Sequence, residues 1–194
     1  MYEFIKGKLI ERNPAYAVIE ANGVGYFINI SLQTYSRLKE DEHCLLFTHL
    51  VIKEDAHLLY GFADPEEREL FRLLIAVSGV GATTARMILS SHTSVEISNA
   101  IVTENVILLQ SIKGIGSKTA QRIIIDLKGK VTRELIPHEK VALIHNTKRD
   151  EALSGLIILG FQKTVASKVL DKVIESNGMT LPVEDLIRKA LKIL

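Results

Sequence analysis

The sequence predicts an α+β chain of several domains, in which a small N-terminal β-barrel precedes a central helical domain and a small C-terminal three-helix bundle. Two observations set the first part apart. Nine of the eleven Tyr and Phe residues lie within residues 1–62, and the same region is rich in strand-like runs. In the rest of the chain, apolar residues recur at helical spacing and one segment is repeated.

Residues 1–63 are expected to form the barrel because β-branched and aromatic runs alternate there with turn residues. The pair Asn22-Gly23 is a strong hairpin signal. About five short strands in about 60 residues predict a small barrel, and an OB-like barrel is the leading candidate. The clearest runs are residues 4–10, 17–20, 25–30 and 46–52.

A helical domain is expected over residues 64–135. Asp64 suits the N-cap of its first helix, Pro65 suits the first helical position, and Glu67 follows the cap by three residues. Glu66 and Glu67 are explained by the helix N-terminus, where negative charge is favourable. No paired-acid or metal-ligand motif surrounds them or Asp126, so we expect no catalytic residues.

The chain beyond Pro137 is predicted to hold a linker and a last domain. The polar composition favours a flexible linker over residues 136–149. Residues 150–194 show three short helical patterns, broken at Gly160 and again at Gly178 and Pro182. Three helices in about 45 residues make a minimal bundle.

Composition limits the class of protein. With 47% hydrophobic and 24% charged residues, the chain is typical of folded soluble proteins. Its aliphatic runs are far shorter than the roughly 18 residues of a membrane span, and no secretory signal is visible. The single cysteine, Cys44, excludes an internal disulfide, and it forms no complete metal-ligand set with His43 and His49. We expect a cytoplasmic chain with no membrane partner, metal or cofactor.

Charge is unevenly distributed, although the net formal charge is only +1. Residues 1–63 carry six Lys and Arg against eight Asp and Glu, whereas residues 108–133 carry six basic residues against Asp126 alone. A basic segment of this kind can mark a nucleic-acid-binding surface or a solvated helix face. Charge alone favours the solvated face.

Part of the basic segment also belongs to an internal repeat, which favours a binding role. Residues 73–88 align with residues 108–123 at an offset of 35 without a gap, and each copy reads as helix, Gly-aliphatic-Gly turn, helix. Such glycines permit a tight turn and close approach of a ligand, and the amides that follow them are free donors at a helix N-terminus. In the second copy Lys118 and Arg122 share the helix face beside that turn. The arrangement suits one backbone phosphate and ignores base identity.

Two enzyme interpretations of the same glycines fail. A P-loop needs Gly-Lys-Thr in sequence, but Ser117 separates Gly116 from Lys118. A dinucleotide-binding fingerprint needs a third glycine after a strand, and the corresponding positions, 84 and 119, are Thr. A plain helix–helix turn would explain one copy, whereas two ungapped copies favour phosphate binding.

Together these features resemble the RuvA family, the DNA-binding subunits of the bacterial Holliday-junction branch-migration complex. The repeat is similar to the tandem helix-hairpin-helix of that family, and the resemblance covers essentially the whole chain. It rests further on residues 22–26, 54–62, 159–161 and 184–191. The hairpin alone occurs in many DNA-binding proteins, but its combination with this barrel and tail is specific.

The resemblance implies a non-catalytic subunit that binds four-way junctions without sequence specificity and holds them open. It implies a homotetramer, alone or paired as an octamer on DNA, that directs the hexameric RuvB ATPase docked on residues 150–194. It also implies RuvC resolvase as a partner in recombination, repair and the SOS response. Two alternatives stay open: a general helix-hairpin-helix DNA-binding module, or the docking part of a repair nuclease.

The resemblance also implies a set of DNA contacts. Family members often have Pro-Lys after the second glycine of the first hairpin, where this chain has Ala82-Thr83, so amides and the Thr83 hydroxyl are expected to serve there. The implied contacts are Gly79, Gly81, Thr83, Gly114, Gly116, Ser117, Lys118 and Arg122.

Glu54 and Asp55 lie between two strand-like runs, at the expected tip of a hairpin. Acidic residues are tolerated in ordinary turns. The resemblance implies instead an acidic pin, whose carboxylates repel phosphates at the junction centre and help to separate the strands.

Overall fold

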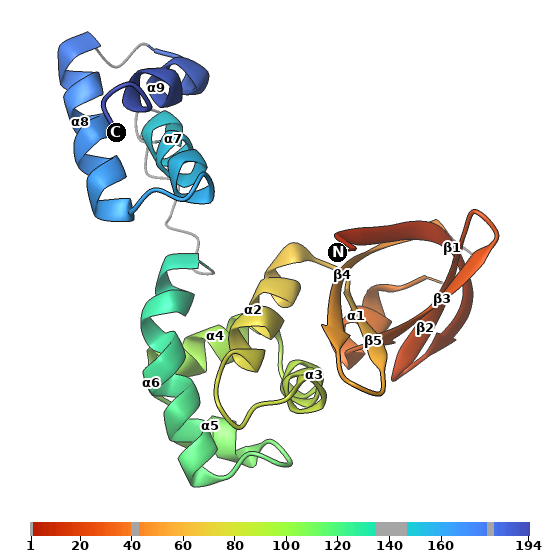
Figure 1. Cartoon of the computed structure of the whole chain (residues 1–194). Helices are drawn as coiled ribbons and strands as arrows, with labels where there is room; N and C mark the ends of the chain where they lie inside the picture. Colours follow the sequence, from red (N-terminus) through yellow and green to blue (C-terminus); the bar gives the residue numbers. More distant parts are fainter. Residues whose placement is uncertain (1, 40–42, 135–146, 178–180) are drawn as a thin grey trace. The chain divides into compact units, whose positions relative to one another are not determined.

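The computed structural model describes the chain except for residue 1 and residues 40–42, 135–146 and 178–180. The N-terminal part is a closed barrel in the strand order β1-β2-β3-β5-β4 (Figure 1). Neighbouring strands are antiparallel except for β3 and β5, which are parallel. The predicted barrel is therefore confirmed. Its strands are β1 (Phe4–Asn13), β2 (Tyr16–Ala21), β3 (Val24–Ile30), β4 (His43–Ile52) and β5 (His57–Phe62).

Local sequence explains how the strands turn and pack. Asn22 and Gly23 both have positive φ, 53° and 82°, which is the backbone of a tight type I′ hairpin between β2 and β3. At Gly7 a Cβ would lie 2.0 Å from the carbonyl oxygen of Glu20, so only glycine allows β1 to approach β2 so closely. A short helix that the sequence did not indicate, α1 (Leu32–Arg37), connects β3 to β4.

Five helices follow the barrel within residues 64–134. The first begins as predicted, because the Asp64 side chain accepts a hydrogen bond from the Glu67 amide and Pro65 follows the cap. A capping box formed by Thr93 and Glu96 starts the third of them. The helices are α2 (Pro65–Ile75), α3 (Ala82–Ser91), α4 (Ser94–Val102), α5 (Val106–Ser111) and α6 (Ser117–Glu134).

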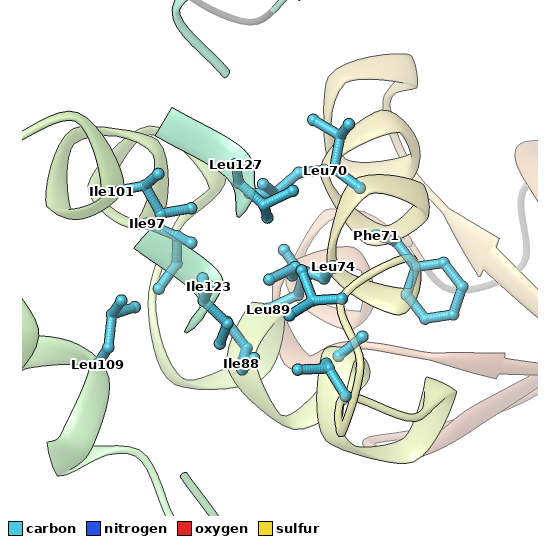
Figure 2. Close-up of a cluster of buried hydrophobic side chains, with 14 of the residues drawn as sticks. Leu70, Phe71, Leu74, Ile88, Leu89, Ile97, Ile101, Leu109, Ile123 and Leu127 are labelled. Carbon is cyan, nitrogen blue, oxygen red and sulfur yellow. The ribbon is translucent and has the colours of Figure 1, made fainter. Parts of the chain in front are cut away.

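These helices surround one apolar core, to which all five contribute (Figure 2). Val80 and Ile115, the aliphatic residues between the paired glycines, belong to it and are 4% and 6% exposed. Each glycine turn is thus attached to the core by its middle residue. The labelled members are Leu70, Phe71, Leu74, Ile88, Leu89, Ile97, Ile101, Leu109, Ile123 and Leu127.

The barrel and the central helices form one compact unit, Met1–Pro137, although each has its own core. The ring of Phe71 packs 5.0 Å from that of Tyr60 and 4.9 Å from that of Phe62, both on β5. Arg86 on α3 donates a hydrogen bond of 2.8 Å to the carbonyl of Ala15 in the barrel. The core of the central helices also includes Tyr60 and Phe62, so the expected boundary at residue 63 cuts through that core.

Glu67 lies in the first turn of α2 and also connects this helix to α1 of the barrel region. It is 1% exposed and accepts hydrogen bonds from the hydroxyls of Ser31 and Thr34, at the start of α1. Burial raises the pKa of its carboxyl above 4.5, and the two hydroxyls oppose that rise.

The second unit, His138–Leu194, has a separate core. Three helices in its described residues confirm the predicted bundle: α7 (Thr147–Ile158), α8 (Lys163–Asn177) and α9 (Val183–Ala190). Gly160, with φ of 99°, ends the α7 segment, and Pro182 caps α9. The expected break at Gly178 and most of the expected linker lie outside the described residues. The last three linker positions, 147–149, form the first turn of α7.

Candidate nucleic-acid interface

The first glycine turn joins α2 to α3. Gly79 has φ of 90°, a conformation that favours glycine. The amide of Val80 donates to the Val77 carbonyl at 3.0 Å, and the amide of Ala85 donates to the Gly81 carbonyl at 2.9 Å. These bonds fix a tight turn whose two glycines stay exposed while the residue between them is buried.

The second turn, between α5 and α6, repeats this geometry. Gly114 has φ of 92°. The amide of Ile115 donates to the Ile112 carbonyl at 3.0 Å, and that of Ala120 donates to the Gly116 carbonyl at 2.9 Å. Each of these residues lies 35 positions after its counterpart in the first turn, so the repeat in the sequence is a repeat in the structure.

Both turns present open backbone. A Cβ added at Gly79, Gly81, Gly114 or Gly116 would meet nothing within 4 Å, so internal packing does not explain the missing side chains. At the start of α3 no side chain caps the helix from Gly81, which leaves its first-turn amides as donors. Open amides at a helix N-terminus suit an anion such as a phosphate.

Arg122 brings the two turns together. Its Nη1 atom donates a hydrogen bond of 3.3 Å to the carbonyl of Ser78, the residue before Gly79. Lys118 and Ser117 lie at the start of the same helix and are exposed. A guanidinium has five N–H donors, so this bond leaves Arg122 able to bind phosphate as well.

The basic segment is only partly available to a ligand. Lys128 forms an ion pair of 2.6 Å with Glu104, and its ammonium lowers the pKa of that carboxyl through a hydrogen bond and charge attraction. Lys113, Lys118 and Arg122 remain as exposed cations near the second turn. Three exposed cations therefore remain near the start of α6.

Glu54 and Asp55 lie at the tip of the hairpin that joins β4 to β5, as the sequence predicts. The amide of Lys53 donates to the carbonyl of Ala56 at 2.8 Å and closes this turn. Both acidic side chains are exposed. Their role as a pin stays a prediction.

The fold adds Lys53, which the sequence reasoning missed. Lys53 lines one cavity of about 350 Å³ together with the first turn of α3. No pattern in the sequence connects position 53 with position 83, because only the packing of the hairpin on the helices brings them together. The lining residues are Val51, Lys53, Ile75, Val80, Gly81, Ala82 and Thr83.

The histidines near Cys44 do not build a metal site. The ring of His49 packs 5.6 Å from that of Phe71. Within the described ranges, no three His, Cys, Asp or Glu side chains are grouped so that they could hold a metal ion. Nor does any described helix combine the length and apolar character needed to cross a membrane.

Three family profiles match successive parts of the chain. The profile described as RuvA N terminal domain matches residues 1–61 and corresponds to the barrel. The one described as SAM-like Helix-hairpin-helix tandem matches residues 71–129, which hold both glycine turns. The one described as RuvA, C-terminal domain matches residues 147–194.

Curated relatives match over the full length. Proteins from Christiangramia forsetii and Flavobacterium psychrophilum are 52% identical over 192 and 196 residues, and one from Cytophaga hutchinsonii is 45% identical over 197 residues. Each alignment covers 99% of this chain and 99% of the relative, and each relative is named Holliday junction branch migration complex subunit RuvA. Sequence, fold and domain order agree, and the chain belongs to the RuvA family.

Proposed function

We propose that this chain binds four-way DNA junctions without sequence specificity, holds them open, and directs the RuvB ATPase that drives branch migration in recombination and repair. The observation that carries the proposal is the duplicated glycine turn. Two open backbone sites with the same hydrogen bonds lie in one compact unit, and Arg122 connects them. Such a pair suits two phosphates of one DNA arm.

Recognition through phosphates suits branch migration for a physical reason. During migration the bases at the branch point change continuously, so a protein that reads base edges would trap the junction at one sequence. Phosphates look the same at every step and carry no sequence information. Backbone amides with Lys118 and Arg122 can therefore hold a DNA arm through its phosphates while the base pairs of that arm change.

The acidic hairpin tip would act at the junction centre. In a homotetramer, four copies of the chain match four DNA arms, and four tips carrying Glu54 and Asp55 converge between them. Their carboxylates repel the phosphates of strands that would otherwise stack across the centre. This repulsion keeps the junction open, and a second tetramer would enclose the DNA as an octamer.

The C-terminal unit would supply the motor contact. Residues 147–194 have their own core and their own family profile. We assign to them the docking of RuvB, whose ATP hydrolysis supplies the energy, so that this chain is a binding subunit in the cytoplasm. RuvC resolvase would act on the junction that the complex holds open.

A branch-migration assay tests this function. A labelled four-way junction is incubated with RuvB, ATP and Mg²⁺, with and without this chain. We expect conversion to duplex products only when the chain is present. No stimulation of RuvB would contradict the proposal, and cleavage of the junction in Mg²⁺ without RuvB would favour the nuclease alternative.

A further inference from the structure

We propose that Lys53, on the hairpin between β4 and β5, binds the DNA phosphate at the first glycine turn in place of a lysine on α3. The inference rests on the proposed function, because it assigns a further residue to the same phosphate contact. Lys53 lies outside the repeat, and only the fold brings it close to the first turn.

The repeat shows what the first turn lacks. Thr83 occupies the position equivalent to Lys118, since the two residues are 35 positions apart in turns with the same hydrogen bonds. The second turn therefore has a cation at the start of its second helix, whereas the first has a hydroxyl. Two equivalent phosphate contacts would require a positive charge from elsewhere at the first turn.

Lys53 is placed to supply that charge. It directly follows β4 and its backbone is held by the bond to Ala56, so its position relative to the sheet is fixed. It lines the same cavity of about 350 Å³ as Gly81 and Thr83, at the start of α3. The apolar part of the lining suits the methylene stem of a lysine, while the side chain stays exposed for contact with a ligand.

Electrostatics favours an anion at this place. The N-terminus of α3 carries partial positive charge, and a lysine beside it adds charge of the same sign. No carboxylate of another described residue forms an ion pair with Lys53, although Glu54 and Asp55 are its neighbours in the chain. A phosphate placed between Lys53 and α3 would pair with the Lys53 ammonium and accept hydrogen bonds from the α3 amides.

The salt dependence of junction binding tests the inference. Affinity of the full-length chain for a labelled four-way junction is measured by fluorescence anisotropy over a range of salt concentrations. For Lys53→Ala, we expect the slope of log affinity against log salt to fall by about 0.9 for each subunit that loses its contact. Lys118→Ala should show the same fall. Lys172→Ala removes an exposed lysine from α8 in the other unit and should leave the slope unchanged.

A rescue variant separates a phosphate contact from a structural effect. Thr83→Lys, introduced into Lys53→Ala, restores a cation at the position equivalent to Lys118, so the wild-type slope should return. If Lys53→Ala keeps the wild-type slope while Lys118→Ala lowers it, the role of Lys53 is wrong and the proposed function stands. A lowered slope that Thr83→Lys fails to restore also overturns the role of Lys53. If the wild-type chain binds no junction, the proposed function itself fails.

Discussion

Two alanine substitutions in the first glycine turn should separate folding from DNA binding. At Gly79 the φ of 90° lies in the region that L-residues avoid, and a Cβ there would meet no atom within 4 Å. The cost of Gly79→Ala is therefore backbone strain of about 1–2 kcal/mol, which the more restricted unfolded chain offsets only in part. Urea unfolding of the two variants and the wild type measures this difference.

At Gly81 the backbone has φ of −84° and ψ of 168°, which any L-residue adopts. Alanine gains about 0.4–1 kcal/mol by restricting the unfolded chain, and it loses a similar amount because glycine is the better N-cap. We expect Gly81→Ala to change stability by less than about 0.5 kcal/mol.

Gly81→Ala should weaken DNA binding although it hardly changes stability. Its new methyl group would stand in the open space before the α3 amides and hold a phosphate away from them. A hydrogen bond to a charged group contributes about 1.5–3 kcal/mol, so losing one lowers junction affinity about tenfold or more. Fluorescence anisotropy with a labelled four-way junction measures this loss.

Gly129→Ala on α6 is the matched control. Gly129 is exposed and has open space around it, so alanine should stabilise the helix by about 0.5–1 kcal/mol and leave binding unchanged. The reasoning is refuted if Gly81→Ala binds junctions as tightly as Gly129→Ala, or if Gly79→Ala is as stable as the wild type.

Three further predictions concern the separate parts of the chain. A chain that ends at residue 135 should bind junctions with wild-type affinity and lose stimulation of RuvB ATP hydrolysis; stimulation by the truncated chain would disprove the division of labour. Reversing the hairpin tip, Glu54→Lys with Asp55→Lys, should change stability by less than about 0.5 kcal/mol. It should also lower the ratio of junction to duplex affinity, most strongly at low salt, and an unchanged ratio would make the tip an ordinary turn. Because burial raises the pKa of Glu67 above 4.5, the folded state holds a proton that the unfolded chain releases, so unfolding free energy should fall as pH rises from 4.5 through the raised value. Urea unfolding across this window should show the fall in the wild type and a flatter profile in Glu67→Gln; parallel profiles would contradict it.

Local signals in the sequence predicted what depends on local structure. Asn22-Gly23 requires its turn conformation whatever surrounds it, and Asp64 caps a helix through an amide three residues away. The glycine turns were equally predictable, because the buried aliphatic residue and the exposed glycines on either side follow from one short motif.

Contacts between distant segments were not predictable in this way. Glu67 looked like a simple helix-start residue, yet it is buried and accepts a hydrogen bond from Ser31, at the start of α1. Lys128 belongs to the basic segment of the sequence, but it is paired with Glu104. Such pairings depend on how the elements pack, and a single sequence carries no periodic signal for them.

The most direct test of the central claim is a competition experiment on DNA shape. A labelled four-way junction bound by the chain is challenged with unlabelled duplex of the same arm sequences, and separately with an unlabelled junction of shuffled sequence. Recognition of junction geometry through phosphates predicts that the shuffled junction displaces the label as well as the original does, while duplex is a much weaker competitor. Equal competition by duplex would show that the chain is a general DNA-binding module, and failure of the shuffled junction to compete would show that it reads base sequence.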